Sequence, residues 1–138
     1  MLRVTTSIRV RYQETDKMGI AYHGNYFTWL EVARIHLLDS IGCPYKELEE
    51  NGYFLPVIRC ECEYKSPARF DDIIDVVVHF PALKQARVNL EYSLTKGETL
   101  IANAKTLHAF VDLSGRVINL SPSLITTFDM KSTIIGDK

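Results

Sequence analysis

The feature that most constrains this fold is a helical segment, residues 25–41, that is apolar over most of its surface. Apolar side chains recur there every three or four positions, which is the spacing of one face of an α-helix. The repeating positions are Tyr26, Leu30, Ala33, Leu37 and Ile41, flanked by Phe27, Val32, Ile35 and Leu38. Because these residues occupy more than half of the circumference, the helix must be covered on several sides.

Residues that favour helix ends lie on both sides of this segment. Asn25, which follows Gly24, is a suitable N-cap because its side-chain oxygen can accept a hydrogen bond from a free backbone amide. Gly42 and Pro44 favour an end to the helix on the other side. The sequence therefore predicts one central helix of about four to five turns.

Alternation of apolar and polar residues predicts strands before and after the helix. The alternating runs cover residues 4–12, 58–65, 74–80, 88–95 and about 100–113. Lys96-Gly97 is a hairpin turn, and the short connections predict an antiparallel meander. We therefore expect the α+β class, with a five-stranded antiparallel sheet wrapped around one long central helix.

The last predicted strand carries apolar residues on both faces. Either a β-bulge switches the faces partway along, or both faces are covered. Apolar residues on the second face of the sheet need a partner, because monomers rarely expose large apolar patches. These residues are Val77, Ile101, Leu107 and Val111, and they predict an oligomer.

Length and charge exclude several classes of protein. The 138 residues, of which 46% are hydrophobic, predict a single folded domain spanning residues 1–138. The 16 basic and 17 acidic residues give a formal net charge of -1. Bulk attraction to nucleic acid or to an anionic membrane is therefore not expected.

Hydropathy and cysteine usage both predict a cytoplasmic location. No apolar run approaches the roughly 20 residues needed to span a bilayer, and the first residues lack the apolar stretch of a signal peptide. The chain has three cysteines, Cys43, Cys60 and Cys62. Cys60 and Cys62 are two positions apart in a predicted strand, which is poor geometry for a mutual disulfide. Two cysteines without a second pair are a weak zinc signal, so we expect three reduced, packed thiols.

Polar residues and glycines crowd the approach to the helix, where Asp16, Tyr22 and His23 precede Asn25. A helix N-terminus offers unpaired N–H groups and the positive end of the helix dipole, which can hold a polarised carbonyl oxygen. A carboxylate near that point could attack the carbonyl carbon or activate water. The alternative is that Asp16 caps a turn and Asn25 caps the helix.

This segment resembles the signature of the 4-hydroxybenzoyl-CoA thioesterase-like branch of the hotdog-fold acyl-CoA thioesterases. The signature has an Asp, a Gly three residues on, Tyr-His or a similar pair, and Asn-Tyr at the start of the central helix. The matching residues here are Asp16, Gly19, Tyr22-His23 and Asn25-Tyr26, and Glu31 and Arg34 on the helix also match. One strand, a helix and four strands is the hotdog order, so the resemblance covers about the whole chain.

The resemblance implies an acyl-CoA thioesterase, without a cofactor, that releases a free acid and CoA. Asp16 matches the catalytic nucleophile or general base, the carbonyl-polarising amide falls at or next to His23, and Tyr22 lines the same corner. The family usually forms dimers, which can pair into tetramers, and binds acyl-CoA in a cleft between two subunits. The expected substrate-binding residues are Gly24, Asn25, Tyr26, Lys65 and Arg69, with Lys84 and Arg87 as further candidates for the nucleotide of CoA. The four basic residues are candidates because they cluster near predicted strand ends, and the alternative is that each is an ordinary solvated charge.

Two other functions stay open. A hydratase or dehydratase on the same fold pairs a carboxylate with a histidine, and Asp16 and His23 supply both residue types. A non-catalytic protein could instead bind acyl-CoA or acyl-carrier protein, but it would not need a carboxylate beside an electrophilic carbon. The Tyr-His-Gly-Asn order at the helix start favours the thioesterase.

The remaining candidate residues are expected to have structural roles. Glu31, inside the apolar helix, is expected to pair with Arg34. The histidines His36, His79 and His108 follow no metal-binding pattern, so no metal site is expected. The aromatic residues expected in the core are Phe27, Trp29, Phe54, Phe70 and Phe110.

Overall fold

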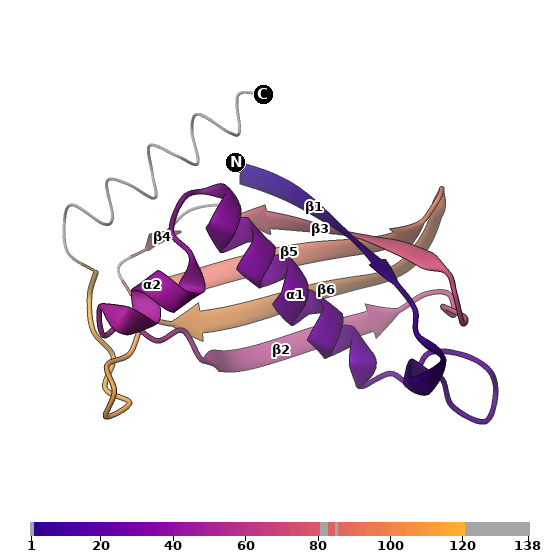
Figure 1. The fold of residues 1–138 in the computed structure, drawn as a ribbon, viewed down its shortest axis with the longest axis horizontal. Helices are drawn as coiled ribbons and strands as arrows, with labels where there is room; N and C mark the ends of the chain where they lie inside the picture. The colour runs from indigo at the N-terminus through magenta and orange to yellow at the C-terminus, as the bar shows by residue number, and fades with distance from the viewer. Residues whose placement is uncertain (1, 81–82, 85, 121–138) are drawn as a thin grey trace.

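The computed structural model describes residues 2–80, 83–84 and 86–120, which form an antiparallel sheet and two α-helices (Figure 1). The long strands are β1 (Leu2–Arg9), β2 (Val57–Tyr64), β3 (Ile73–Phe80), β5 (Arg87–Lys96) and β6 (Thr99–Ala109). A two-residue strand, β4 (Leu83–Lys84), pairs with β5. The helical elements are the 3₁₀ turn η1 (Tyr12–Glu14), the central helix α1 (Asn25–Ser40) and α2 (Tyr45–Glu50). The predicted α+β class, with five long strands and one long helix, is confirmed.

The order of strands across the sheet is β1-β3-β5-β6-β2, and every pairing is antiparallel. Only β3, β5 and β6 form a meander, so the prediction of a continuous meander is wrong for β2. This strand lies at the far edge beside β6, and residues 65–72 return the chain to the other edge. There the Val10 amide donates to the Asp72 carbonyl and the Asp71 amide donates to the Val10 carbonyl, both at 2.9 Å.

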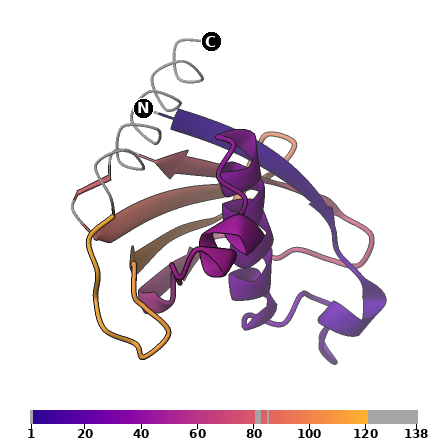
Figure 2. The same ribbon diagram turned by 60° about the vertical axis from the view of Figure 1, so that its left-hand side comes forward.

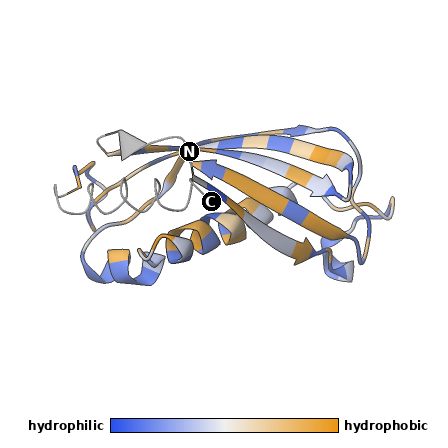
Figure 3. Cartoon of the chain, turned by 90° about the horizontal axis from the view of Figure 1, so that it is seen from above, coloured by the Kyte–Doolittle hydropathy of each residue, from blue (hydrophilic) through white to orange (hydrophobic). Residues whose placement is uncertain are grey.

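The sheet curves around α1, which crosses its inner face (Figures 1 and 2). Figure 3 shows apolar residues along this helix, and strands on which apolar and polar residues alternate. Burying each large aliphatic side chain contributes about 1.5–3 kcal/mol, so this contact dominates the core. The buried residues of α1 are Tyr26, Trp29, Leu30, Ala33, Arg34, Leu37 and Leu38, and the core cluster adds Ile74, Val76 and Val78 of β3 and Leu90, Tyr92 and Leu94 of β5.

The described residues leave one side of α1 open, although its composition predicts cover on several sides. Val32 is 45% exposed and Ile35 is 39% exposed. They are three residues apart and therefore share one face of the helix. This apolar face is uncovered among the described residues.

A β-bulge explains the two apolar faces of the last strand. The pairing register between β5 and β6 shifts between Leu94 and Thr95, opposite Ile101. Ile101 and Ala102 are consecutive, yet both are buried, because the extra residue turns the strand. Ile101 therefore needs no partner subunit, whereas Val77, Leu107 and Val111 are only half-buried.

A buried polar network links α1 to the sheet through Arg34. Its guanidinium pairs with Glu31, which confirms the predicted pair, and donates to the Leu55 carbonyl at 2.6 Å. The same group lies 3.5 Å from Nδ1 of His108, so the ring proton belongs on Nε2, where Thr106 lies at 2.8 Å. Burial, and then the Arg34 charge, lower the pKa of His108 to about 4.

Several local predictions are wrong. Gly24 rather than Asn25 is the N-cap of α1, and Phe70, expected in the core, is 54% exposed. The helix α2 was not predicted, because its apolar content is low. Trp29 and Phe110 are buried as expected, and Phe27 and Phe54 are half-buried.

The cysteines lie in different environments. Cys43 is buried, Cys62 is half-buried and Cys60 is exposed, and no disulfide joins these three described residues. Cys60 thus departs from the expected packing. No helix of the described residues has the length and apolar character needed to cross a membrane.

The buried His108 ring predicts a loss of stability in mild acid. The folded protein holds the ring neutral, whereas the unfolded chain binds a proton below about pH 6.5, so the free energy of unfolding falls as the pH drops from about 6.5 to 4. The loss attributable to His108 is up to about 3 kcal/mol. Urea unfolding across this range checks it. His108→Gln should flatten the dependence, and equal slopes in both proteins would contradict the assignment.

Candidate active site

A tight turn carries Asp16. The amide of Asp16 donates to the carbonyl of Ile20 at 2.9 Å, and the amide of Gly19 donates back to Asp16 at 3.0 Å. Gly19 has a φ of 79°, which glycine adopts without strain. One carboxylate oxygen of Asp16 accepts the Met18 amide at 2.8 Å. Asp16 therefore does cap a turn, while its side chain stays exposed at the edge of a cleft.

The buried carboxylate of Glu14 joins this turn to α1. It accepts the Arg11 amide at 2.7 Å through one oxygen and the Trp29 indole at 2.9 Å through the other. The Glu14 carbonyl accepts the Tyr22 amide and the Asn25 side-chain amide, both at 2.8 Å. Asn25 thus serves as a link between loop and helix rather than as the cap.

These hydrogen bonds set the charge of Glu14. Burial alone would raise its pKa, but hydrogen bonds from Arg11 and Trp29 outweigh burial and lower the pKa below its usual value. The group is therefore a carboxylate at neutral pH. Through its side chain and backbone, Glu14 holds Arg11 on one side of Asp16 and Tyr22 and Asn25 on the other.

The residues just before α1 have backbone amides that are available to a ligand. The amide of Asn25 donates to Tyr22 at 3.0 Å and that of Tyr26 donates to His23 at 3.3 Å. Neither His23 nor Gly24 donates its amide to a backbone carbonyl among the described residues. A Cβ at position 24 would lie 2.9 Å from the Tyr22 ring, so any other residue there would require this exposed ring to shift.

A cleft of about 380 Å³ opens between the Asp16 turn, the start of α1 and the end of β2. Tyr26 and Tyr64 form part of its wall, with ring centroids 4.8 Å apart and planes at 84°. His23 stacks on Tyr22 at 4.4 Å. The lining residues are Asp16, Ile20, Ala21, His23, Tyr26, Tyr64, Lys65, Ser66 and Pro67.

The structure brings most predicted site residues together. Four of them line the cleft: Asp16, His23, Tyr26 and Lys65. Gly24 and Asn25 lie at the helix start, and exposed Tyr22 lies beside His23. Arg69 does not line the cleft, although its backbone pairs with Ile20.

Of the two further candidates for the nucleotide of CoA, Arg87 does not line the cleft. Arg87 pairs with Ala109 at the opposite end of β6 from Ala102, the partner of Tyr64. The side chain of Lys84 lies outside what the structure describes. Lys65 is paired with Glu63 at 2.5 Å.

Sequence reasoning missed Glu14 and Tyr64. Glu14 is one of many acidic residues in the sequence, and nothing in its spacing shows that Trp29 and Arg11 converge on it. Tyr64 lies in the alternating run 58–65, where nothing in the sequence distinguishes it from the other strand residues. Its hydroxyl donates to the carbonyl of His23 at 2.9 Å, across 41 residues of sequence.

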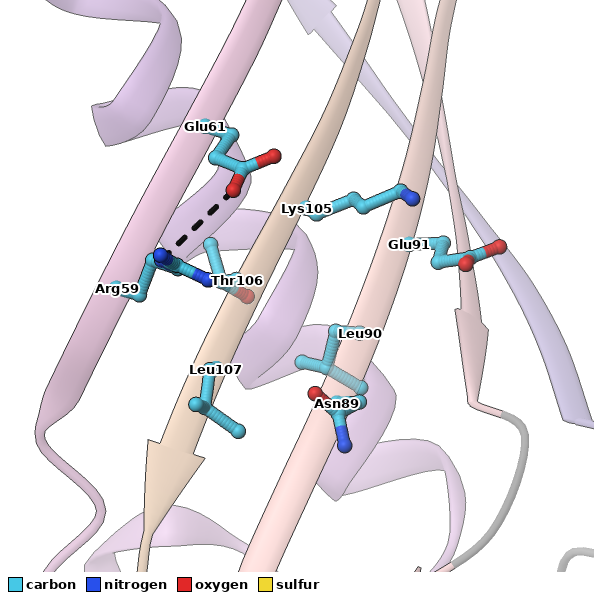
Figure 4. A pocket seen from close by; sticks show the side chains of 8 residues that line it. All are labelled: Arg59, Glu61, Asn89, Leu90, Glu91, Lys105, Thr106 and Leu107. Atoms are coloured by element: carbon cyan, nitrogen blue, oxygen red, sulfur yellow. Dashed lines mark ion pairs between the residues drawn. The ribbon is translucent and has the colours of Figure 1, made fainter.

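A second hollow, of about 340 Å³, lies on the face of the sheet opposite α1 (Figure 4). Its charged side chains come from the neighbouring strands, and the Arg59–Glu61 ion pair spans 3.8 Å. It includes Lys105, Glu91 and Asn89 but no helix terminus. Opposite charges and the lack of a helix end make it less suited to carbonyl chemistry than the Asp16 cleft. No group of three potential metal ligands occurs among the described residues.

Comparison with known proteins identifies related proteins. Residues 10–129 match the family described as the thioesterase-like superfamily. The acyl-CoA thioester hydrolase YbgC of Escherichia coli is 27% identical over 106 residues, covering 76% of this chain and 79% of the relative.

Solved structures show the same fold. The DHNA-CoA thioesterase of Staphylococcus aureus superposes with a TM-score of 0.90 at 27% identity, covering 99% of this chain and 95% of the other. A 4-hydroxybenzoyl-CoA thioesterase mutant in complex with 4-hydroxybenzoyl-CoA gives a TM-score of 0.81 at 20% identity, covering 92% and 99% of the two chains. At that identity the second likeness concerns the fold alone.

The central position of Glu14 predicts that Glu14→Gln destabilises the protein. The amide NH₂ of glutamine would face a buried donor, either the Arg11 amide or the Trp29 indole. We expect the free energy of unfolding at pH 7 to fall by about 1–3 kcal/mol in urea titrations. The deficit should shrink as the pH falls below about 4.5, because the unfolded wild-type chain then binds a proton at Glu14 that the folded protein takes up only at lower pH. Glu98→Gln, at an exposed position, is the control. Equal losses in both variants would contradict the role of Glu14.

Proposed function

The chain belongs to the thioesterase-like superfamily and hydrolyses the thioester bond of acyl-CoA, and we propose that the Asp16 cleft is its active site. The observation that carries the proposal is the convergence of a carboxylate and a helix start on one cleft. A thioester needs these two elements and little more. Its leaving thiol has a pKa of about 8.5, so protonation of the leaving group matters less than it does for an amide.

The proposed reaction begins with the thioester carbonyl oxygen at the start of α1. The amides of His23 and Gly24 donate to this oxygen, and the helix dipole adds to the stabilisation of the negative charge that develops there. Asp16 acts on the carbonyl carbon by one of two routes. As a general base, it takes a proton from water while the water oxygen attacks the carbon. As a nucleophile, it forms a mixed anhydride that water then hydrolyses. In both routes the C–S bond breaks and CoA leaves as a thiolate.

The other residues of the cleft bind and orient the substrate in this proposal. His23, Tyr26 and Tyr64 line the cleft, and exposed Tyr22 lies beside His23. Lys65 lines the cleft, and exposed Arg69 pairs through its backbone with Ile20, another lining residue, so both cations are suited to the phosphates of CoA. Thioesters of acyl-carrier protein share the pantetheine arm of CoA and are a further possible substrate.

We also propose that a second copy of the chain completes the site. Among the described residues β2 pairs only with β6, so its other edge presents backbone groups that favour pairing with another strand. Val57 is 47% exposed and Ile58 is 52% exposed on this strand, and α1 leaves Val32 and Ile35 uncovered. Pairing of two β2 edges would bury these residues and bring a partner close to Tyr64. A homodimer follows, and half-buried Val77 and Leu107 on the outer face of the sheet suit a further pairing into a homotetramer.

The compartment proposed is the cytoplasm. Cys60 is an exposed thiol and Cys62 is half-buried nearby on the same strand, and reducing conditions keep such thiols intact. We further propose that residues 1–138 act as one domain, since the family match covers residues 10–129.

Replacement of Asp16 tests the proposed chemistry. Asp16→Asn keeps the size of the side chain but removes its basicity, so kcat/KM should fall by at least about 100-fold. The assay measures free thiol released from acetyl-, hexanoyl-, palmitoyl- and benzoyl-CoA with a thiol-reactive dye. Asp39→Asn, on the exposed end of α1, is the matched control and should behave as wild type.

Three outcomes would contradict this assignment. Turnover in Asp16→Asn equal to wild type would remove Asp16 from the mechanism. Tight binding by wild type without thiol release would indicate a binding protein. A change in enoyl absorbance with crotonyl-CoA would indicate a hydratase.

A charge on the free edge of β2 tests the proposed dimer. Ile58→Lys places an ammonium group where a partner strand would pack, so we expect monomers in size-exclusion chromatography with light scattering, together with loss of thioesterase activity. Leu113→Lys introduces the same charge at a position that is 87% exposed and lies outside β2, and should leave the oligomer intact. A dimer that survives Ile58→Lys would contradict the interface.

A further inference from the structure

We propose that Tyr64 is a positioning residue that strengthens the carbonyl-polarising amide of Gly24 through the peptide group between His23 and Gly24. The inference rests on the proposed function and adds a residue that neither the family signature nor the spacing of the sequence identifies. Tyr64 is the last residue of β2, and its side chain lines the cleft together with Asp16 and His23.

The geometry connects Tyr64 to one defined peptide group. Its hydroxyl donates to the carbonyl oxygen of His23 at 2.9 Å. The N–H at the other end of that planar peptide belongs to Gly24. In a trans peptide the C=O and N–H point in opposite directions, so holding the oxygen from the β2 side fixes the direction in which the Gly24 amide points.

The same hydrogen bond also changes how strongly the Gly24 amide donates. A donor on a carbonyl oxygen polarises the peptide group and makes its N–H a better donor, because hydrogen bonds in a chain reinforce one another. The His23 oxygen accepts a second, longer bond from the Tyr26 amide at 3.3 Å. The Tyr64 hydroxyl is thus the closer of the two donors on that oxygen.

Tyr64 is held in place by its ring and keeps its proton. The ring meets the ring of buried Tyr26 edge to face at 4.8 Å and that of His23 at 6.3 Å. Burial and the neighbouring Cys62 thiol raise the pKa of Tyr64 to about 12. The hydroxyl is therefore a donor throughout the working pH range, and its ring contacts persist when the oxygen alone is removed.

Tyr64→Phe removes the donor and keeps the ring. Losing a direct oxyanion donor costs about 100- to 1,000-fold in rate, and the loss of a group behind that donor should cost less, about tenfold in kcat. KM should change by less than about twofold, because the hydrogen bond matters most when charge develops on the carbonyl. The acyl-CoA that wild type hydrolyses fastest in the panel serves as the substrate.

Tyr12→Phe is the matched control for this substitution. It makes the same chemical change at the same end of the molecule, on a side chain that is 78% exposed and outside the cleft. Its kcat and KM should equal those of wild type. A thermal melt of both variants checks that each remains folded at the assay temperature.

A spectroscopic measurement separates this role from simple support of the fold. In an Asp16→Asn background the substrate persists, and infrared difference spectra of acyl-CoA labelled with ¹³C at the thioester carbonyl report how strongly the carbonyl is polarised. We expect a shift to lower frequency on binding and a smaller shift when Tyr64→Phe is added.

The outcomes separate the two claims. A folded Tyr64→Phe protein with wild-type kcat, or with an unchanged carbonyl shift, would overturn the role of Tyr64 while leaving the thioesterase assignment intact. Failure of wild type to release thiol from any acyl-CoA would instead overturn the proposed site. A lower kcat together with a reduced carbonyl shift would support the inference.

Discussion

The Glu14 carboxylate is the contact on which the site depends, because it holds a polar loop against the most buried aromatic residue of α1. Trp29, which is 1% exposed, donates its indole to Glu14 at 2.9 Å, and the Glu14 backbone takes two further hydrogen bonds from Tyr22 and Asn25. The loop is thus tied to the first two turns of the helix. Since Asp16 is two residues beyond Glu14, its position relative to the helix start follows from this link rather than from its own hydrogen bond to Met18.

The curved sheet supplies the other constraint. It covers one side of α1 and places the end of β2 beside the start of the helix, so that Tyr64 reaches the His23 carbonyl. The bulge at Ile101 lets β6 bury consecutive residues. The buried Arg34 network then joins α1 to Leu55, just before β2, and to His108 on β6. β2, whose last residue lines the cleft, is therefore linked to α1 near both of its ends.

Local patterns in the sequence predicted the central helix, the five long strands and the Glu31–Arg34 pair. They predicted these because periodicity records which face of an element is buried. Periodicity does not record which strands are neighbours, so the place of β2 at the far edge was missed. The cap of α1 was misassigned because Asn25 bonds to Glu14, a contact between loop and helix that spacing does not reveal. The same limit applies to Tyr64, whose partner lies 41 residues away.

The most direct test of this account is a crystal structure of the Asp16→Asn protein with an unhydrolysed acyl-CoA. The account predicts that the thioester carbonyl oxygen lies within hydrogen-bond distance of the Gly24 or His23 amide and that the side chain at position 16 faces the carbonyl carbon. A substrate whose thioester lies elsewhere, such as in the second hollow beside Arg59 and Lys105, would contradict this account.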